Sequence, residues 1–211
     1  MRDPNTYKLL TPGPLTTTLT VREAMLVDRC TWDDDYKSMT QDIRSRLLKI
    51  AHADDDYTAV LMQGSGTSGV ESVLRSLPGA NDHVLVLVNG AYSKRMCEIL
   101  ARHRIAHTAL EFDWAESPDA AAVEAHLAAH PEVTMVSMVH NETTTGLLND
   151  IASVARVVKA AGRTMIVDAM SSFGAVDIDV PGLDLDVVVS SANKCIQGVP
   201  GFSFVIVKRT V

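Results

Sequence analysis

A single lysine stands within Ser190-Ser191-Ala192-Asn193-Lys194-Cys195-Ile196-Gln197-Gly198, between two apolar runs. The run before it, Val187 to Val189, predicts a buried strand, and the run after it, Phe202 to Val207, predicts an antiparallel neighbour. A lysine held among small residues at the end of a buried strand can be partly desolvated. Desolvation lowers the pKa of the amine, which can then attack a carbonyl group. A solvated loop lysine is an equally good interpretation of this stretch alone, so the rest of the chain must decide.

The composition predicts a globular protein with a sizeable core. The 211 residues are 46% hydrophobic and 21% charged, which argues against disorder. The formal net charge is −7 with no Lys/Arg cluster, so we expect no nucleic-acid partner. We also expect no membrane segment and no signal peptide, since no apolar stretch is long enough. Three cysteines without metal-ligand spacing predict reduced thiols, no metal and a cytoplasmic location.

Hydrophobic patterning predicts about seven strands with helices between most of them. The predicted strands cover residues 58–62, 84–88, 105–112, 133–139, 164–168, 184–190 and 202–207. The predicted helices begin near Thr20, Ser38, Ser68, Tyr92, Ser117 and Asn149 or Asp150, mostly at capping residues. This alternation predicts an α/β fold, a three-layer sandwich with a mostly parallel seven-stranded sheet. Residues 1–19 precede it as an extended arm, because Pro12-Gly13-Pro14 excludes a helix.

A glycine turn, Gln63-Gly64-Ser65-Gly66-Thr67-Ser68, joins the first predicted strand, which we expect to be buried, to a helix. Free N–H groups and the helix dipole favour an anion at such a turn, and Ser65 and Thr67 add hydroxyl donors. The turn is neither a Walker A sequence nor a full dinucleotide fingerprint, and similar turns occur without ligands. It is nevertheless a candidate phosphate site.

Other polar side chains also follow strands. Tyr92 follows the strand 84–88, Thr143 lies after 133–139, and Asp168 ends 164–168. Each has a plain alternative: core packing is the other interpretation of Tyr92, and a hydrogen bond to the turn after it is the other interpretation of Asp168. His140 is a possible base, but a hydrogen-bonded structural histidine is the commoner case. Because a parallel sheet brings the carboxyl ends of its strands to one edge, these residues and Lys194 can meet there.

An anion cradle, an aromatic ring, a carboxylate and an amine together suit pyridoxal 5'-phosphate (PLP). A carboxylate keeps the pyridine nitrogen of PLP protonated, which makes the ring an electron sink. A lysine forms a Schiff base with its aldehyde and then serves as a general base. The combination therefore predicts a PLP-dependent enzyme.

Seven stretches then carry a family resemblance along the whole chain. The sequence resembles the 2-aminoethylphosphonate–pyruvate transaminases, within the class V group of fold-type I PLP enzymes. The stretches are 10–17 (LTPGPLTT), 30–36 (CTWDDDY), 63–66 (QGSG), 89–92 (NGAY), 142–146 (ETTTG), 167–174 (VDAMSSFG) and 190–201 (SSANKCIQGVPG). Of these, WDDDY and ANKCIQG resemble this transaminase more than its alanine–glyoxylate relatives.

The resemblance implies a role for each candidate. Lys194 would carry the cofactor and Asp168 would pair with its pyridine nitrogen. The remaining cofactor contacts would come from Ser65, Gly66 and Thr67 to the phosphate, Tyr92 to the ring and Thr143 near the phenolic oxygen. The implied reaction transfers the amino group of 2-aminoethylphosphonate to pyruvate, giving phosphonoacetaldehyde and L-alanine, in phosphonate catabolism. The implied assembly is a homodimer with sites at the subunit interface.

Members of the family continue beyond the lysine strand, whereas this sequence stops at Val211. We therefore expect 20–211 to be an incomplete PLP-binding large domain, with the C-terminal small domain absent. An alanine–glyoxylate or serine–pyruvate transaminase stays open as an alternative, and so does an inactive PLP-binding fragment. A cysteine desulfurase is less favoured, because Cys195 directly adjoins the lysine.

Overall fold

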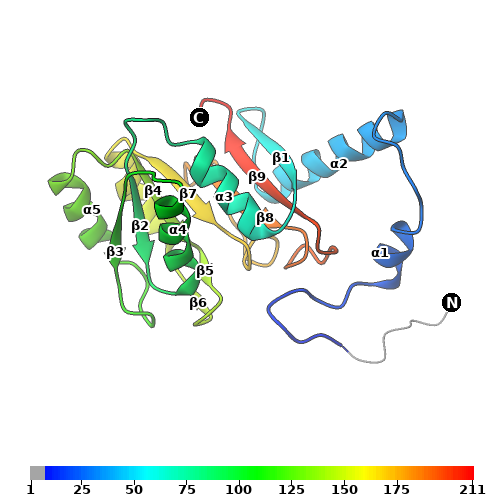
Figure 1. The fold of residues 1–211 in the computed structure, drawn as a ribbon, viewed down its shortest axis with the longest axis horizontal. Coiled ribbons are helices and arrows are strands. Elements are labelled where there is room, and N and C mark those ends of the chain that lie inside the picture. The colour runs from blue at the N-terminus through cyan, green and yellow to red at the C-terminus, as the bar shows by residue number, and fades with distance from the viewer. Residues whose placement is uncertain (1–7) are drawn as a thin grey trace.

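Seven strands form one twisted sheet at the centre of the computed structural model, which describes residues 8–211 (Figure 1). Their order across the sheet is β1-β9-β8-β7-β4-β2-β3. The bounds are β1 Tyr57–Gln63, β2 Val84–Val88, β3 His107–Glu111, β4 Met135–Val139, β7 Thr164–Asp168, β8 Val187–Ser191 and β9 Phe202–Lys208. A short hairpin, β5 (Asn141–Glu142) and β6 (Leu147–Leu148), stands outside this sheet.

Six of the seven strands point the same way. The pairs from β8 through β7, β4 and β2 to β3 are parallel, while β9 is antiparallel to both β8 and β1. Because β9 is antiparallel to both of its neighbours, β1 and β8 point in the same direction. Their carboxyl ends therefore lie at the same edge of the sheet. The predicted mostly parallel seven-stranded sheet is confirmed, and so is the antiparallel neighbour of the lysine strand.

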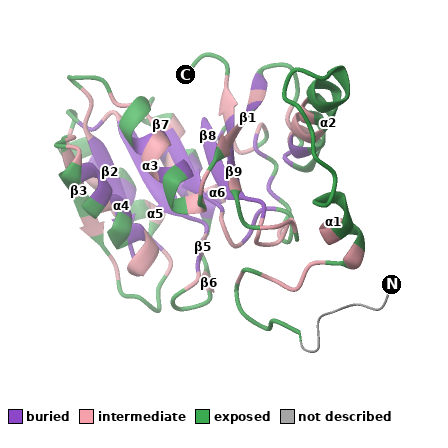
Figure 2. Ribbon diagram, turned by 45° about the vertical axis from the view of Figure 1, so that its right-hand side comes forward, coloured by how far each residue is buried: buried purple, intermediate pink, exposed green. Residues whose placement is uncertain are grey.

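Helices cover both faces of the sheet, which confirms the predicted three layers. On one face lie α3 (Gly66–Ser76) and α4 (Ala91–Arg102), and on the other lie α2 (Asp34–Ile50), α5 (Ala120–Ala129) and α6 (Ile151–Ala160). Side chains along β2 alternate between the two cores, with Val84, Val86 and Val88 facing α3 and α4. Leu85 and Leu87 face the opposite layer. Burial concentrates in these central strands (Figure 2).

Several predicted helix starts are wrong by a few residues, because serines, threonines and aspartates compete for the cap position. The observed N-caps are Thr18 for α1 (Leu19–Ala24), Asp33 for α2, Ser65 for α3 and Asp119 for α5, in place of Thr20, Ser38, Ser68 and Ser117. Asp150 caps α6 as predicted. The strand β1 was expected to be buried, but it lies at the sheet edge, where Val60 is 44% exposed.

The N-terminal segment, residues 8–33, runs outside the layers of the sheet and its helices and touches them near Lys194 (Figure 1). Residues 8–18 form neither helix nor strand, as the predicted arm requires, and residues 1–7 of that arm lie outside the described residues. No residue between 8 and 46 is buried (Figure 2). Within residues 8–211, no helix is long and apolar enough to cross a membrane.

Candidate active site

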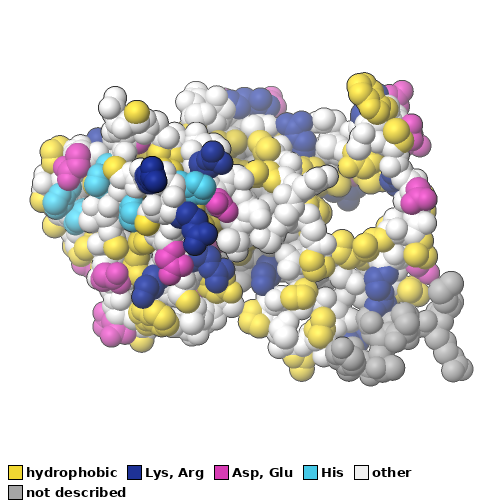
Figure 3. Space-filling view, in the orientation of Figure 1, with side chains coloured by type: hydrophobic (Ala, Val, Ile, Leu, Met, Phe, Trp, Pro, Cys, Tyr) yellow, Lys and Arg dark blue, Asp and Glu magenta, His cyan; other side chains and the backbone are white. Residues whose placement is uncertain are grey.

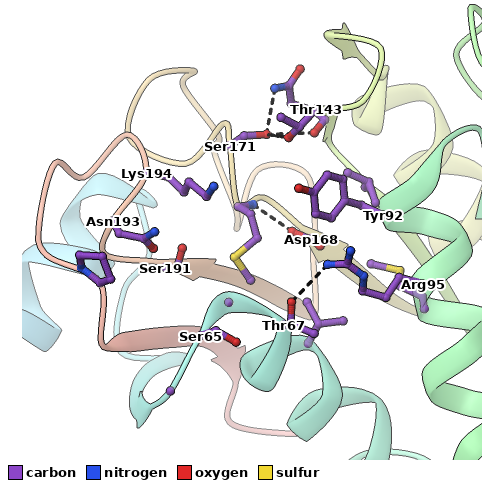
Figure 4. Close-up of a pocket in the computed structure, with 18 of the residues that line it drawn as sticks. Ser65, Thr67, Tyr92, Arg95, Thr143, Asp168, Ser171, Ser191, Asn193 and Lys194 are labelled. Atoms are coloured by element: carbon purple, nitrogen blue, oxygen red, sulfur yellow. Dashed lines mark hydrogen bonds between the residues drawn. The ribbon is translucent and has the colours of Figure 1, made fainter. Parts of the chain in front are cut away.

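A cavity of about 430 Å³ opens at the carboxyl edge of the parallel strands (Figure 4). All the candidates named from the sequence line it: Ser65, Gly66, Thr67, Tyr92, Thr143, Asp168 and Lys194. They come from the ends of five strands that point the same way, so the sheet itself gathers them. The cavity is large enough for a cofactor of ordinary size.

The glycine turn after β1 leads directly into α3. Gly64 has a φ of +119°, which favours glycine, and Ser65 caps the helix by accepting a hydrogen bond from the Ser68 N–H. A Cβ on Gly66 would lie 2.5 Å from the Met170 Sδ, so a side chain there would push the end of the Met170 side chain aside. The first N–H groups of α3 therefore face the cavity at close range, in an arrangement suited to an anion.

Asp168 is the one carboxylate lining the cavity within the described residues, and it is 5% exposed. Its Oδ1 accepts a hydrogen bond of 2.9 Å from the Met170 N–H. No ion pair among residues 8–211 includes it. Burial raises the pKa of Asp168 to about 6; the Met170 hydrogen bond opposes this rise and the charge of Glu142 adds to it. A cationic ligand would relieve this cost.

Lys194 lies in the turn that follows β8 and points into the cavity from the side opposite Tyr92 (Figure 4). It is partly buried, and its Nζ donates a hydrogen bond of 3.2 Å to the Gly13 carbonyl. A Cβ on Gly13 would lie 2.3 Å from the lysine Cδ. The N-terminal arm thus reaches the lysine, across 181 positions of sequence.

Tyr92 stands in the first turn of α4, held by a buried carboxylate. Glu142, which is fully buried, accepts hydrogen bonds from the Tyr92 N–H at 3.4 Å and the Ser93 N–H at 3.3 Å. An anion at a helix N-terminus is stabilised by the free N–H groups and the helix dipole. Thr143, next to Glu142, exchanges a hydrogen bond of 2.8 Å with the Ser171 hydroxyl at the cavity wall.

Sequence reasoning missed several residues that line the cavity. The polar ones are Arg95, Asn141, Ser171, Ser191 and Asn193. Ser191 and Asn193 lie inside the lysine stretch itself, and Arg95 follows Tyr92 by one helical turn, so spacing along α4 was the available signal. The contact of the arm with Lys194 carried no sequence signal, because it joins opposite ends of the chain.

His140 is not among the cavity residues. It is 4% exposed, and its Nδ1 has no hydrogen-bond partner within the described residues. The Nδ1 atom therefore departs from the hydrogen-bonded structural histidine that the sequence favoured over a base. Burial lowers the pKa of His140 to about 4, so the imidazole is neutral at pH 7.

Comparison with known proteins gives the site its family. The family described as "Aminotransferase class-V" matches residues 30–211, which is most of the chain. This chain is a class-V aminotransferase family member. The sheet matches the large domains of solved aminotransferases of fold type I. The pyridoxamine–pyruvate aminotransferase of Mesorhizobium loti superposes with a TM-score of 0.88 at 28% identity, over 100% of this chain and 54% of that one.

Curated relatives are more similar in sequence. The 2-aminoethylphosphonate–pyruvate transaminase of Lysinibacillus sphaericus is 53% identical over 97% of this chain. The enzyme of the same name from Salmonella paratyphi B is 52% identical over 96% of it. In both comparisons the chain spans 56% of the length of the relative.

Proposed function

We propose that this chain belongs to an aminotransferase that moves the amino group of 2-aminoethylphosphonate to pyruvate with PLP, giving phosphonoacetaldehyde and L-alanine. The observation that carries the proposal is the convergence, in one cavity, of a lysine amine, an unpaired buried carboxylate and a helix N-terminus. Identity of 52–53% to transaminases of that name, along nearly all of this chain, supports the choice of substrates.

The residues present fit PLP as a cofactor. Asp168 is a buried carboxylate without a cationic partner among residues 8–211, and a protonated pyridine nitrogen would supply one. Gly66 has no side chain that would cover the first N–H groups of α3, and Ser65 and Thr67 add hydroxyls beside them at the cavity wall. Tyr92 offers a ring face, Lys194 offers the amine, and Thr143 offers a hydroxyl for the phenolic oxygen.

When bound, PLP supplies an electron sink that stabilises negative charge on the substrate carbon next to nitrogen. The chain supplies the proton transfers. The Lys194 Nζ would hold the aldehyde end of the cofactor and, once free, would serve as the base that removes and returns the substrate proton. The Gly13 carbonyl, 3.2 Å from Nζ, orients the amine toward the cavity. Asp168 would keep the ring nitrogen of the cofactor protonated by charge pairing.

We propose that the working assembly is a homodimer in which a second copy covers the N-terminal segment. Large apolar side chains stand exposed there, among them Leu10 at 94%, Trp32 at 82% and Leu26 at 78%. Figure 3 shows apolar side chains along this part of the molecule. A monomer that exposes several large apolar side chains loses the free energy of their burial, whereas a dimer that covers them recovers it. Light scattering of the chain should give the mass of a dimer.

The substrates are tested by a donor panel. The chain with added PLP is given pyruvate and 2-aminoethylphosphonate, and alanine formation is followed by chromatography. Serine with pyruvate, and alanine with glyoxylate, are run as alternative pairs. The proposal predicts that the phosphonate donor is the best by at least tenfold in kcat/KM. Preference for serine or alanine would instead assign the alternative specificity, and bound PLP without turnover of any donor would make this chain an inactive cofactor-binding unit.

A further inference from the structure

Arg95 lies between two parts of the cavity that the proposed function assigns to the cofactor. Its Nη1 donates a hydrogen bond of 3.4 Å to the Thr67 hydroxyl, in the first turn of α3. Its guanidinium carbon stands 4.9 Å from the centre of the Tyr92 ring, a cation–π distance. Figure 4 shows the guanidinium reaching from α4 across the cavity floor, toward the start of α3. The side chain is thus fixed in place by weak contacts only.

The guanidinium retains most of its hydrogen-bonding capacity. It carries five N–H donors, and within residues 8–211 it makes one long hydrogen bond. None of the ion pairs formed among those residues includes Arg95. A guanidinium is weakly hydrated and suited to bidentate bonds with phosphoryl oxygens. Its spare donors face the cavity, so an anion is the ligand that would use them.

The charged side chains that line the cavity also favour an anionic ligand at Arg95. Within the described residues, Arg95 and Lys194 are its two cations and Asp168 is its one anion. In the proposed function Lys194 would bind the aldehyde carbon of the cofactor, and Asp168 would pair with its ring nitrogen. The glycine turn that precedes α3 offers only neutral donors to the phosphate, namely N–H groups and the hydroxyls of Ser65 and Thr67. Arg95 is therefore the cation available to balance a phosphate dianion.

We propose that Arg95 binds the phosphate of the cofactor, as a charged partner to the N-terminus of α3. This inference rests on the proposed function and adds a residue to its cofactor site. The chemistry recognised is a dianionic phosphoryl group, and a phosphonate substrate would present one as well. The hydrogen bond to Thr67 favours the cofactor phosphate, because it ties the guanidinium to the turn at the start of α3.

The test compares two aldehydes that differ only in the phosphate. Wild type, Arg95→Gln, Arg95→Lys and the control Lys94→Gln are titrated with PLP and with pyridoxal, and bound ligand is read from the absorbance of the lysine-linked aldehyde. Lys94 is exposed on the same helix, does not line the cavity and loses the same charge when replaced. Thermal melting checks that every variant folds. Inorganic phosphate is added as a competitor to wild type and Arg95→Gln.

The inference predicts that Arg95→Gln weakens PLP binding by about 10- to 100-fold, the value of a lost charge-assisted hydrogen bond. Pyridoxal binding should be unchanged, Arg95→Lys should retain part of the PLP affinity, and phosphate should compete less well in Arg95→Gln. Equal losses for both aldehydes would overturn the inference, because Arg95 would then act by holding the Tyr92 ring. Unchanged PLP binding, with or without a raised KM for 2-aminoethylphosphonate, would overturn it too. If wild type binds neither aldehyde, the proposed function itself fails, which is a different result.

Discussion

Two aspartates on neighbouring strands are equally buried and have opposite surroundings. Asp168 ends β7 and Asp186 immediately precedes β8, so the two lie at opposite edges of the sheet, and each is 5% exposed. Asp186 pairs with the Lys159 Nζ at 2.6 Å and accepts the Met165 N–H at 2.7 Å. Asp168 accepts one backbone N–H and has no cationic partner among residues 8–211.

The difference separates a structural carboxylate from a functional one. A buried charge is tolerated when it is paired and hydrogen-bonded, and it costs stability when it is not. At the edge with Asp186 the charged side chains form ion pairs with one another, in a cluster that includes Lys159, Lys208 and Asp184. Among residues 8–211, the edge with Asp168 leaves its carboxylate, the Lys194 amine and the Arg95 guanidinium without ion pairs to one another. Such unmatched groups mark the edge where a ligand completes the pairing.

The largest effect should come from Asp168→Asn. The amide keeps the shape and the hydrogen bond from the Met170 N–H, but it loses the negative charge that holds the ring nitrogen protonated. We expect the rate of alanine formation to fall by at least about 100-fold, as for other removed electrostatic contacts of this kind. Steady-state kinetics with saturating PLP measure this. An Asp168→Asn variant with near wild-type kcat would show that the carboxylate takes no part in the reaction.

Asp186→Asn should lower the stability of the fold and leave PLP binding nearly unchanged. It leaves the Lys159 ammonium with only the more distant Asp184 carboxylate, at 4.0 Å, and breaking a buried pair lowers the free energy of unfolding by about 3–5 kcal/mol. The PLP dissociation constant should change by less than about twofold, because Asp186 lies at the far edge of the sheet from the cavity. Urea unfolding measures the first quantity and an absorbance titration the second. Lys159→Met combined with Asp186→Asn should recover part of the loss, and no recovery would contradict the pairing.

His140 is a second buried group, and its Nδ1 has no hydrogen-bond partner among residues 8–211. We expect it to make the free energy of unfolding depend on pH on the acid side. Its backbone N–H donates to the Asp168 carbonyl, so it borders the same strand end. Its pKa is lowered to about 4 from 6.5, so its contribution to stability is present above pH 6.5 and is lost as the pH falls toward 4. We expect about 3 kcal/mol of loss across that range, and a flatter profile in His140→Asn. Equal profiles for the two proteins would refute this.

Asp168 should titrate in the opposite sense. Its pKa is raised to about 6 from 3.8, so its contribution is fully present below pH 3.8 and is lost as the pH rises through 6. In the absence of PLP, Asp168→Asn should therefore be more stable than wild type at pH 7.5, by about 3 kcal/mol, and close to it at pH 4. Denaturant unfolding of both proteins at the two pH values measures this. A constant difference between them would mean that the carboxylate is not strained in the empty cavity.

The sequence predicted the strands of the sheet more accurately than the N-cap residues of the helices. It also predicted the main cavity residues, but not the residues that contact them. The strand set followed from β-branched runs, and six strands pointing one way placed Ser65, Tyr92, Thr143, Asp168 and Lys194 at one edge. The caps were misplaced where several short polar residues stand in a row, as around Ser65 and Ser68, because the energies of the alternatives are nearly equal. Arg95 and Gly13 were missed, because their roles come from contacts between elements and not from local pattern.

The most direct measurement is where PLP attaches. The chain is incubated with PLP, reduced with borohydride, digested, and the modified peptide is identified by mass, with Lys194→Ala as control. We predict a visible absorbance band and one label on Lys194 in the wild type, and neither of them in the control. No band, or label spread over surface lysines, would contradict the claim that the carboxyl edge of this sheet is a cofactor site built around Lys194.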